Sequence, residues 1–157
     1  GETVPDALIE KMHKAGTFDQ GFVTTEYLAA CIWDMAYHTQ KADITSDAET
    51  FEKEAMNKIN LPSTIIPRYR STYFNHIFAG GYSAGYYSYI WSGVLDTDAF
   101  EVFKINGLFN SDYAKSFRKN VLEKGGTEDP MELYKSFRGA EPSVEPLLRK
   151  RGLDQVK

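Results

Sequence analysis

Three regularly spaced tyrosines follow a glycine pair near the middle of the chain. Tyr82, Tyr86 and Tyr89 stand at positions i, i+4 and i+7, directly after Gly80 and Gly81, and on a helix this spacing would place the three rings on one face. A phenol can donate a hydrogen bond to an oxyanion while its ring forms the wall of a pocket. The glycines would let the chain flex and would offer backbone N–H groups to a ligand. The pattern therefore indicates the wall of a peptide-binding cleft, with amphipathic packing of the tyrosines as the alternative.

Metal ligation is the second chemistry to consider, because helical enzymes often use it. A zinc site of the His-Glu-x-x-His type needs two histidines one helical turn apart, so that both imidazoles reach one ion. The three histidines are His13, His38 and His76, and none has a second histidine at i+4. We therefore expect this chain to bind no metal by itself, and we interpret His13 and His38 as structural.

Two other groups could do chemistry, but each has a simpler interpretation. Cys31 lies between Ala30 and Ile32 in an expected helix, which favours a small buried core residue over a reactive thiol. Asp96 and Asp98 are paired carboxylates in a polar stretch. We interpret them as a helix cap or a solvated turn.

The elements that must position these residues are all expected to be helices, because no strand alternation of convincing length occurs. The 24–40 helix should bury Leu28, Cys31, Ile32 and Met35. The expected helices cover residues 5–16, 24–40, 47–59, 71–77, 83–94, 111–125, 130–138 and 142–150. The 83–94 helix could resume after residue 96 and continue to residue 104. Ser46 or Asp47, Ser111 and Asp129 are the expected N-terminal caps, and Gly152 should end the last helix. The fold class is therefore all-α.

Composition and charge limit the classes of function. The chain has 157 residues, 42% of them hydrophobic, and a formal net charge of −4. This length suits one domain, residues 1–157, and the negative charge argues against nucleic acid as a partner. No run of about 18 apolar residues predicts a membrane span. The single cysteine and the lack of a signal-peptide pattern in residues 1–5 favour a cytoplasmic location.

Motifs throughout the chain, and the tyrosine stretch above all, resemble the thimet-oligopeptidase family of zinc metallopeptidases, specifically its bacterial dipeptidyl carboxypeptidase branch. The Gly-Gly-Tyr run with its following tyrosines is the most specific of these motifs. The other matching segments are residues 18–22, 26–29, 73–76, 137–142, 146–148 and 151–153. The resemblance thus covers almost the whole chain.

The resemblance implies a fold and an activity for a longer parent protein. Members of the family have two mostly helical lobes around a deep channel that admits short, unstructured peptides. Their zinc ion is held by a His-Glu-x-x-His helix and a further glutamate, which precede the part of the sequence that this chain resembles. The chain then corresponds to the last fifth to quarter of such a protein. We expect zinc in the parent enzyme, none bound by this chain, and no activity from the chain alone.

The resemblance also implies roles for particular residues. Tyr82 and Tyr89 would donate hydrogen bonds to the developing oxyanion or to neighbouring substrate carbonyls. His76 would contact the substrate backbone, and Tyr86 would line the pocket. The glycine pair would allow the loop to close over a short peptide.

Three readings of the chain remain open at the level of sequence. The leading hypothesis is the substrate-binding, C-terminal part of a zinc-dependent oligopeptidase or dipeptidyl carboxypeptidase. The alternative is a stand-alone helical module that binds peptides or a partner without catalysis, and a third possibility is a purely structural helical unit. As part of a longer protein, the chain should pack against the remainder of its parent. By itself it should associate with its own copies through the apolar face left exposed.

Overall fold

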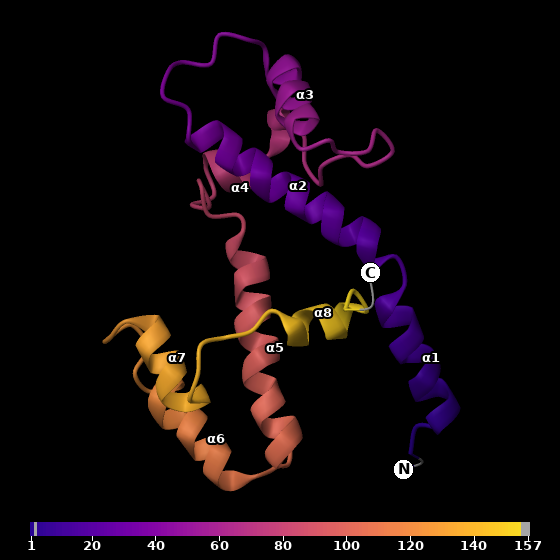
Figure 1. Ribbon diagram of the computed structural model, residues 1–157, viewed down its shortest axis with the longest axis vertical. Helices are drawn as coiled ribbons and strands as arrows, with labels where there is room; N and C mark the ends of the chain where they lie inside the picture. The colour runs from indigo at the N-terminus through magenta and orange to yellow at the C-terminus, as the bar shows by residue number, and fades with distance from the viewer. Residues whose placement is uncertain (2, 155–157) are drawn as a thin grey trace. The chain divides into compact units, whose positions relative to one another are not determined.

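The computed structural model describes residue 1 and residues 3–154, and every regular element in that part of the chain is helical. The prediction of an all-α fold is therefore confirmed (Figure 1). The elements in chain order are α1 (Asp6–Thr17), α2 (Gln20–His38), α3 (Ala48–Lys58), the 3-10 turn η1 (Ser71–Tyr73), α4 (Asn75–Phe78), α5 (Ser88–Asn106), α6 (Ser111–Phe117), the π-helical turn η2 (Arg118–Leu122), α7 (Pro130–Arg138) and α8 (Glu145–Arg151). The chain divides into two compact units, residues 1–89 and residues 90–157.

Several helix ends follow from residues that the sequence places there. The Asp47 carboxylate accepts backbone N–H groups at the start of α3, and Asp129 does the same at the start of α7, as predicted. Gly152 ends α8 with a φ of 67°. The predicted cap at Ser111 was wrong by one residue, because the side chain of Asn110 accepts the free N–H groups of α6.

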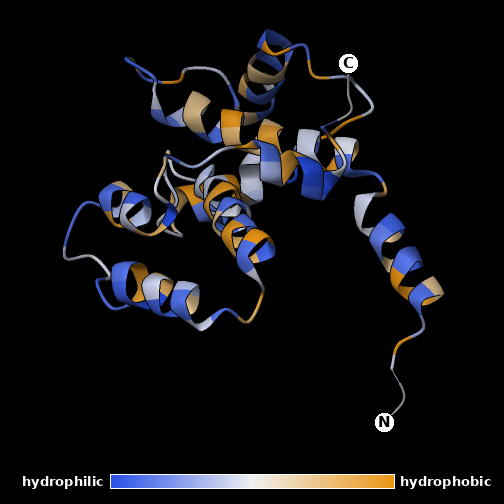
Figure 2. Cartoon of the chain, turned by 60° about the horizontal axis from the view of Figure 1, so that its bottom comes forward, coloured by the Kyte–Doolittle hydropathy of each residue, from blue (hydrophilic) through white to orange (hydrophobic). Residues whose placement is uncertain are grey.

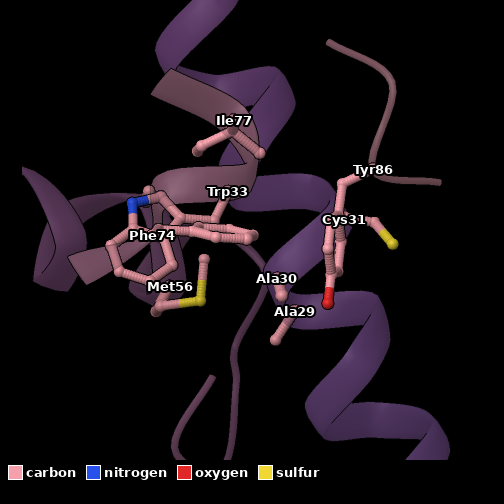
Figure 3. Packing of buried hydrophobic residues seen from close by; sticks show 9 residues of the cluster. Ala29, Ala30, Cys31, Trp33, Met56, Phe74, Ile77 and Tyr86 are labelled. Atoms are coloured by element: carbon pink, nitrogen blue, oxygen red, sulfur yellow. The ribbon is translucent and has the colours of Figure 1, made fainter. Parts of the chain in front are cut away.

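The core of the first unit is built around Trp33, which has no exposed surface. The ring of Phe74 lies 5.9 Å from the Trp33 ring, and Ile77 of α4 closes the cluster (Figure 3). Ala29 and Ala30 of α2 are buried in the same cluster. Their small side chains let the neighbouring segments approach the α2 backbone closely, which leaves room for the large aromatic rings.

The predicted buried face of α2 was wrong except for Cys31. Leu28 is 38% exposed, Ile32 42% and Met35 38%, whereas Trp33 and the charged residue Asp34 are fully buried. The periodicity of large aliphatic residues therefore marks an apolar stripe on α2 that the first unit itself does not cover.

α1 has a similar uncovered side. It contains no buried residue, and Leu8, Ile9 and Met12 are between 38% and 63% exposed. Figure 2 shows hydrophobic and hydrophilic residues alternating along this helix. Within residues 1 and 3–154, no helix combines the length and the hydropathy that a membrane crossing requires.

In the second unit, α5 runs without interruption through Asp96 and Asp98, so the interpretation of both as a cap or solvated turn was wrong. Asp96 lies on the exposed side of the helix, but Asp98 is 1% exposed. The Asp98 carboxylate accepts hydrogen bonds from the Tyr134 hydroxyl at 2.5 Å and from Nε of Arg138 at 2.9 Å. The hydrogen bond with Asp98 raises the pKa of Arg138, and burial together with the same carboxylate raises the pKa of Tyr134. This network joins α5 to α7.

The role of this network can be tested by removing the guanidinium. Arg138→Met should lower the free energy of unfolding by about 3 kcal/mol, because it leaves a buried carboxylate without its counter-charge. Urea unfolding followed by helical circular dichroism measures the change. Arg149→Met is the matched control, since Arg149 pairs with Glu101 at the surface and should cost less than about 1 kcal/mol. Equal losses in the two variants would contradict the argument.

Candidate functional site

The segment that carries the predicted site is a turn, not a helix. Residues 79–87 connect α4 to α5, and α5 begins only at Ser88. The prediction of a helix from Ser83, with the three tyrosines on one helical face, was therefore wrong. Gly81 has a φ of 81° and Ala84 a φ of 53°, and two left-handed residues so close together are incompatible with a right-handed helix.

The turn nevertheless brings the predicted residues together. The Tyr82 and Tyr89 rings stack with centroids 5.2 Å apart, and the Tyr86 ring meets Tyr89 edge-on at 5.4 Å. The ring of His76, in the preceding helix α4, lies 5.9 Å from the Tyr82 ring and 5.8 Å from the Tyr86 ring. The Tyr69 ring lies 5.2 Å from His76. We call these four residues, together with Tyr69, the tyrosine cluster.

The members of the cluster differ in exposure. Tyr89 is 46% exposed, and Tyr82 and His76 are half-buried. Tyr86 is only 2% exposed, and its ring lies beside Cys31 in the core of the first unit (Figure 3). Burial raises the pKa of Tyr86 to about 12, so its hydroxyl stays protonated at neutral pH. The structure places Tyr86 behind the more exposed tyrosines, where it supports their rings.

The side chains of the two outer tyrosines, Tyr82 and Tyr89, also affect each other. The hydrogen bond between the Tyr82 and Tyr89 side chains is the largest cause of a raised Tyr89 pKa. A phenol with a raised pKa remains a neutral donor at neutral pH. In such a pair of phenols one O–H is engaged with the other ring's oxygen, so the second O–H can donate to a carbonyl oxygen or to an oxyanion.

The glycine pair has a steric role in the turn. A Cβ atom at Gly80 would lie 2.8 Å from the His76 Cα and 3.0 Å from the His76 carbonyl oxygen, and Gly81 has the left-handed backbone noted above. The Gly80 N–H donates to the Asn75 carbonyl at 2.8 Å, so this group is already engaged within the turn. The closure of the loop over a ligand stays a prediction.

Tyr69 and Arg68 join the site from the stretch between α3 and η1, for which the sequence predicted neither a helix nor a site residue. The Tyr69 ring lies 5.2 Å from His76 and 6.1 Å from Tyr86. The guanidinium carbon of Arg68 lies 5.8 Å from the centroid of the Tyr69 ring. Arg68 is exposed, and no described carboxylate forms an ion pair with it. An aromatic residue between two arginines, just after a proline, was the signal that could have identified this pair.

Asp34 is a further residue that sequence reasoning missed. It has no exposed surface, and its two carboxylate oxygens accept the backbone N–H groups of Ala84 and Tyr86, each at 2.9 Å. Nδ1 of His38 lies 2.8 Å from the same carboxylate. The signal was a single acidic residue within the apolar run 28–36, because a charge in such a run is rarely buried unless it is paired.

The arrangement can bind the oxygen atoms of a peptide, with phenols, an imidazole and a guanidinium as donors. It does not supply a zinc site. Among residues 1 and 3–154, no three His, Cys, Asp or Glu side chains lie close enough to hold a metal ion. The zinc that the resemblance implies therefore does not fit any donor set that the structure describes in this chain.

The close approach of Gly80 to the His76 backbone can be tested without a ligand. Gly80→Ala should lower the free energy of unfolding of the first unit by about 1–3 kcal/mol, because the added methyl group overlaps the His76 backbone. Gly21→Ala is the control: Gly21 lies in α2 with open space around it, so alanine should stabilise the helix slightly. Thermal unfolding of both variants gives the comparison, and a Gly80→Ala protein as stable as the wild type would refute the close contact.

Comparison with known proteins places these features in a family. The family model described as peptidase family M3 matches residues 1–153. The chain is 39% identical over 158 residues to the dipeptidyl carboxypeptidase of Salmonella typhimurium, which covers 99% of this chain and 23% of that protein. It is 39% identical to the dipeptidyl carboxypeptidase of Escherichia coli strain K12, and the match covers 98% of this chain and 23% of that protein. It is 37% identical to oligopeptidase A of the same strain, again over 98% of this chain and 23% of the relative. The chain thus spans less than a quarter of the length of these relatives. The predicted resemblance is confirmed, and the chain belongs to peptidase family M3.

Proposed function

We propose that this chain is the substrate-binding part of a zinc-dependent oligopeptidase or dipeptidyl carboxypeptidase that hydrolyses short peptides. The observation that carries the proposal is the tyrosine cluster, in which the Tyr82 and Tyr89 rings stack on each other and His76 lies against the Tyr82 ring. The names of the relatives, dipeptidyl carboxypeptidase and oligopeptidase A, support the choice of substrate class. We place the parent enzyme in the cytoplasm, as the single cysteine favours.

The proposed roles follow from exposure. Tyr82 and Tyr89 are more exposed than Tyr86 and stack on each other, so their hydroxyls are the donors that a substrate carbonyl or a developing oxyanion would meet. Hydrogen-bond donors fixed in advance stabilise the transition state at little cost in reorganisation. His76 would contact the substrate backbone, and Tyr86 would hold the other rings in place. In this proposal the described residues bind and orient the peptide, and the metal ligands lie outside this chain.

The role of the Tyr89 hydroxyl can be tested in the intact parent enzyme. Tyr89→Phe should lower kcat by about 10- to 1,000-fold if the hydroxyl stabilises the transition state. Tyr87→Phe is the matched control, because Tyr87 is 50% exposed and no ring contact joins it to the tyrosine cluster. An unchanged kcat in Tyr89→Phe would remove the proposed catalytic role.

Arg68 suggests how a peptide with a free C-terminus would be recognised. It is an exposed guanidinium over the Tyr69 ring, at the edge of the tyrosine cluster. A guanidinium binds a carboxylate through two parallel charge-assisted hydrogen bonds. The proposal is therefore that Arg68 pairs with the C-terminal carboxylate of the substrate.

Two substrates that differ only in their C-terminus separate this role from a general loss of activity. In the parent enzyme, Arg68→Met should raise KM by about 10-fold for a peptide with a free carboxylate. The KM for the same peptide with a C-terminal amide should change little. Arg68→Lys should recover part of the preference, since it keeps the charge but loses the bidentate geometry. A loss of the same size for both substrates would exclude carboxylate recognition.

The exposed apolar residues suggest where the parent chain continues the packing. The side chains of Leu28, Ile32 and Met35 on α2, and of Leu8 and Met12 on α1, are all at least 38% exposed. We propose that the remainder of the parent protein covers them, since stripes of this kind on soluble proteins usually mark contact surfaces.

The same residues predict that the isolated 157-residue chain associates with itself. Light scattering should give an average mass above that of a monomer at high concentration, and Ile32→Lys should lower it. A clean monomer in the wild type at all concentrations would contradict this prediction.

A further inference from the structure

We infer that Asp34 is a positioning residue for the tyrosine cluster, and that it acts by fixing the backbone of the turn between α4 and α5. Its carboxylate holds the N–H groups of Ala84 and Tyr86. Among the described hydrogen bonds, none joins a side chain of the cluster's four tyrosines or its histidine to this carboxylate. Any effect of Asp34 on ligand binding must therefore pass through the backbone of the turn.

The two backbone hydrogen bonds explain how the Asp34 carboxylate can be buried. A buried carboxylate is costly unless its oxygen atoms are hydrogen-bonded and its charge is paired. Each oxygen of Asp34 accepts one backbone N–H at 2.9 Å, and His38, one helical turn along α2, supplies the third partner at 2.8 Å. The carboxylate thus gains two of its three partners only when residues 84–86 adopt the observed path.

The turn needs this support because its own backbone hydrogen bonds, donated by residues such as Tyr82, Gly85 and Ser88, do not engage Ala84. Ala84 is a non-glycine residue in the left-handed region, at a φ of 53°, which costs about 1 kcal/mol relative to a right-handed conformation. The hydrogen bond from Gly85 N–H to the Tyr82 carbonyl, at 2.8 Å, closes only one side of the bend. The Ala84 N–H bond to Asp34 is what ties this strained residue to α2.

α2 holds Tyr86 through both of its backbone groups. The Tyr27 hydroxyl donates to the Tyr86 carbonyl at 2.8 Å, and Asp34 accepts the Tyr86 N–H. Tyr27 and Asp34 are seven residues apart, so both lie on the same face of α2. Tyr89 lies three residues after this fixed point and Tyr82 two residues before Ala84. Fixing residues 84–86 therefore fixes the stack of the two outer rings.

The turn can be tested in the 157-residue chain by amide hydrogen exchange measured with NMR. In the wild type, the N–H groups of Ala84 and Tyr86 should be protected relative to the exposed connection 40–46. In Asp34→Asn they should exchange at least 10-fold faster, while the slowest amides of the second unit stay unchanged. Asp43→Asn is the control, because it removes the same charge from an exposed position.

The effect on ligand binding rests on the proposed function and is measured separately. A short peptide with a free C-terminus is titrated into the same variants, with tyrosine fluorescence as the signal. Asp34→Asn should weaken binding at least 5-fold, and Asp43→Asn should leave it unchanged. No saturable binding in the wild type would count against the proposed function, while the exchange rates would still decide the role of Asp34.

Three results would overturn the inference. One is faster exchange in Asp34→Asn that affects all amides of the first unit equally, since this would mean a general loss of stability. Another is a faster-exchanging turn with unchanged peptide affinity. The third can be seen in the wild type, even if Asp34→Asn does not fold. If the amides of Ala84 and Tyr86 exchange as fast as those of the 40–46 connection, Asp34 does not fix the backbone of the turn.

Discussion

The burial of one carboxylate constrains the arrangement of the first unit. Asp34 lies in the middle of α2 with no exposed surface, and a buried carboxylate must find donors within a few ångströms. The backbone N–H groups of Ala84 and Tyr86 are two of these donors, and the imidazole of His38 is another. The turn must therefore lie directly against this face of α2. Ala29 and Ala30, buried in the same core, have side chains small enough to allow that approach.

The position of this turn between α4 and α5 determines what each tyrosine can do. Because the backbone of residue 86 is tied to α2, the Tyr86 ring points into the core, next to Cys31 and Phe74. The rings of Tyr82 and Tyr89 remain accessible and stack on each other. A single regular helix would have made the three tyrosines equivalent members of one face. The turn instead separates one supporting ring from two rings that can meet a ligand.

Sequence patterns could predict the fold class, several helix ends and the membership of the cluster. Local patterns are sufficient for these features. Asp47 and Asp129 cap helices through hydrogen bonds to residues two and three positions later, and the glycine–tyrosine run is specific enough to indicate a family. The path of residues 82–87 could not be predicted, because it depends on hydrogen bonds to Asp34, about 50 positions earlier in the chain. The buried face of α2 was missed for a related reason. The periodicity of apolar residues predicts that Leu28, Ile32 and Met35 are buried. It does not distinguish residues buried inside the unit from residues that the unit leaves exposed.

A comparison of two buried carboxylates, Asp34 and Asp98, shows why Asp34 matters more for the path of the chain. Asp98 is satisfied by side chains, Tyr134 and Arg138, and long side chains can reach a carboxylate from several backbone positions. Asp34 is satisfied largely by main-chain N–H groups, which cannot move without moving the chain itself. A carboxylate bound by side chains therefore restricts which residues occupy neighbouring positions, whereas one bound by backbone amides restricts the path of the chain. In this protein that path is the turn that carries the tyrosine cluster, so the geometry of the candidate site is set from α2, outside the cluster itself.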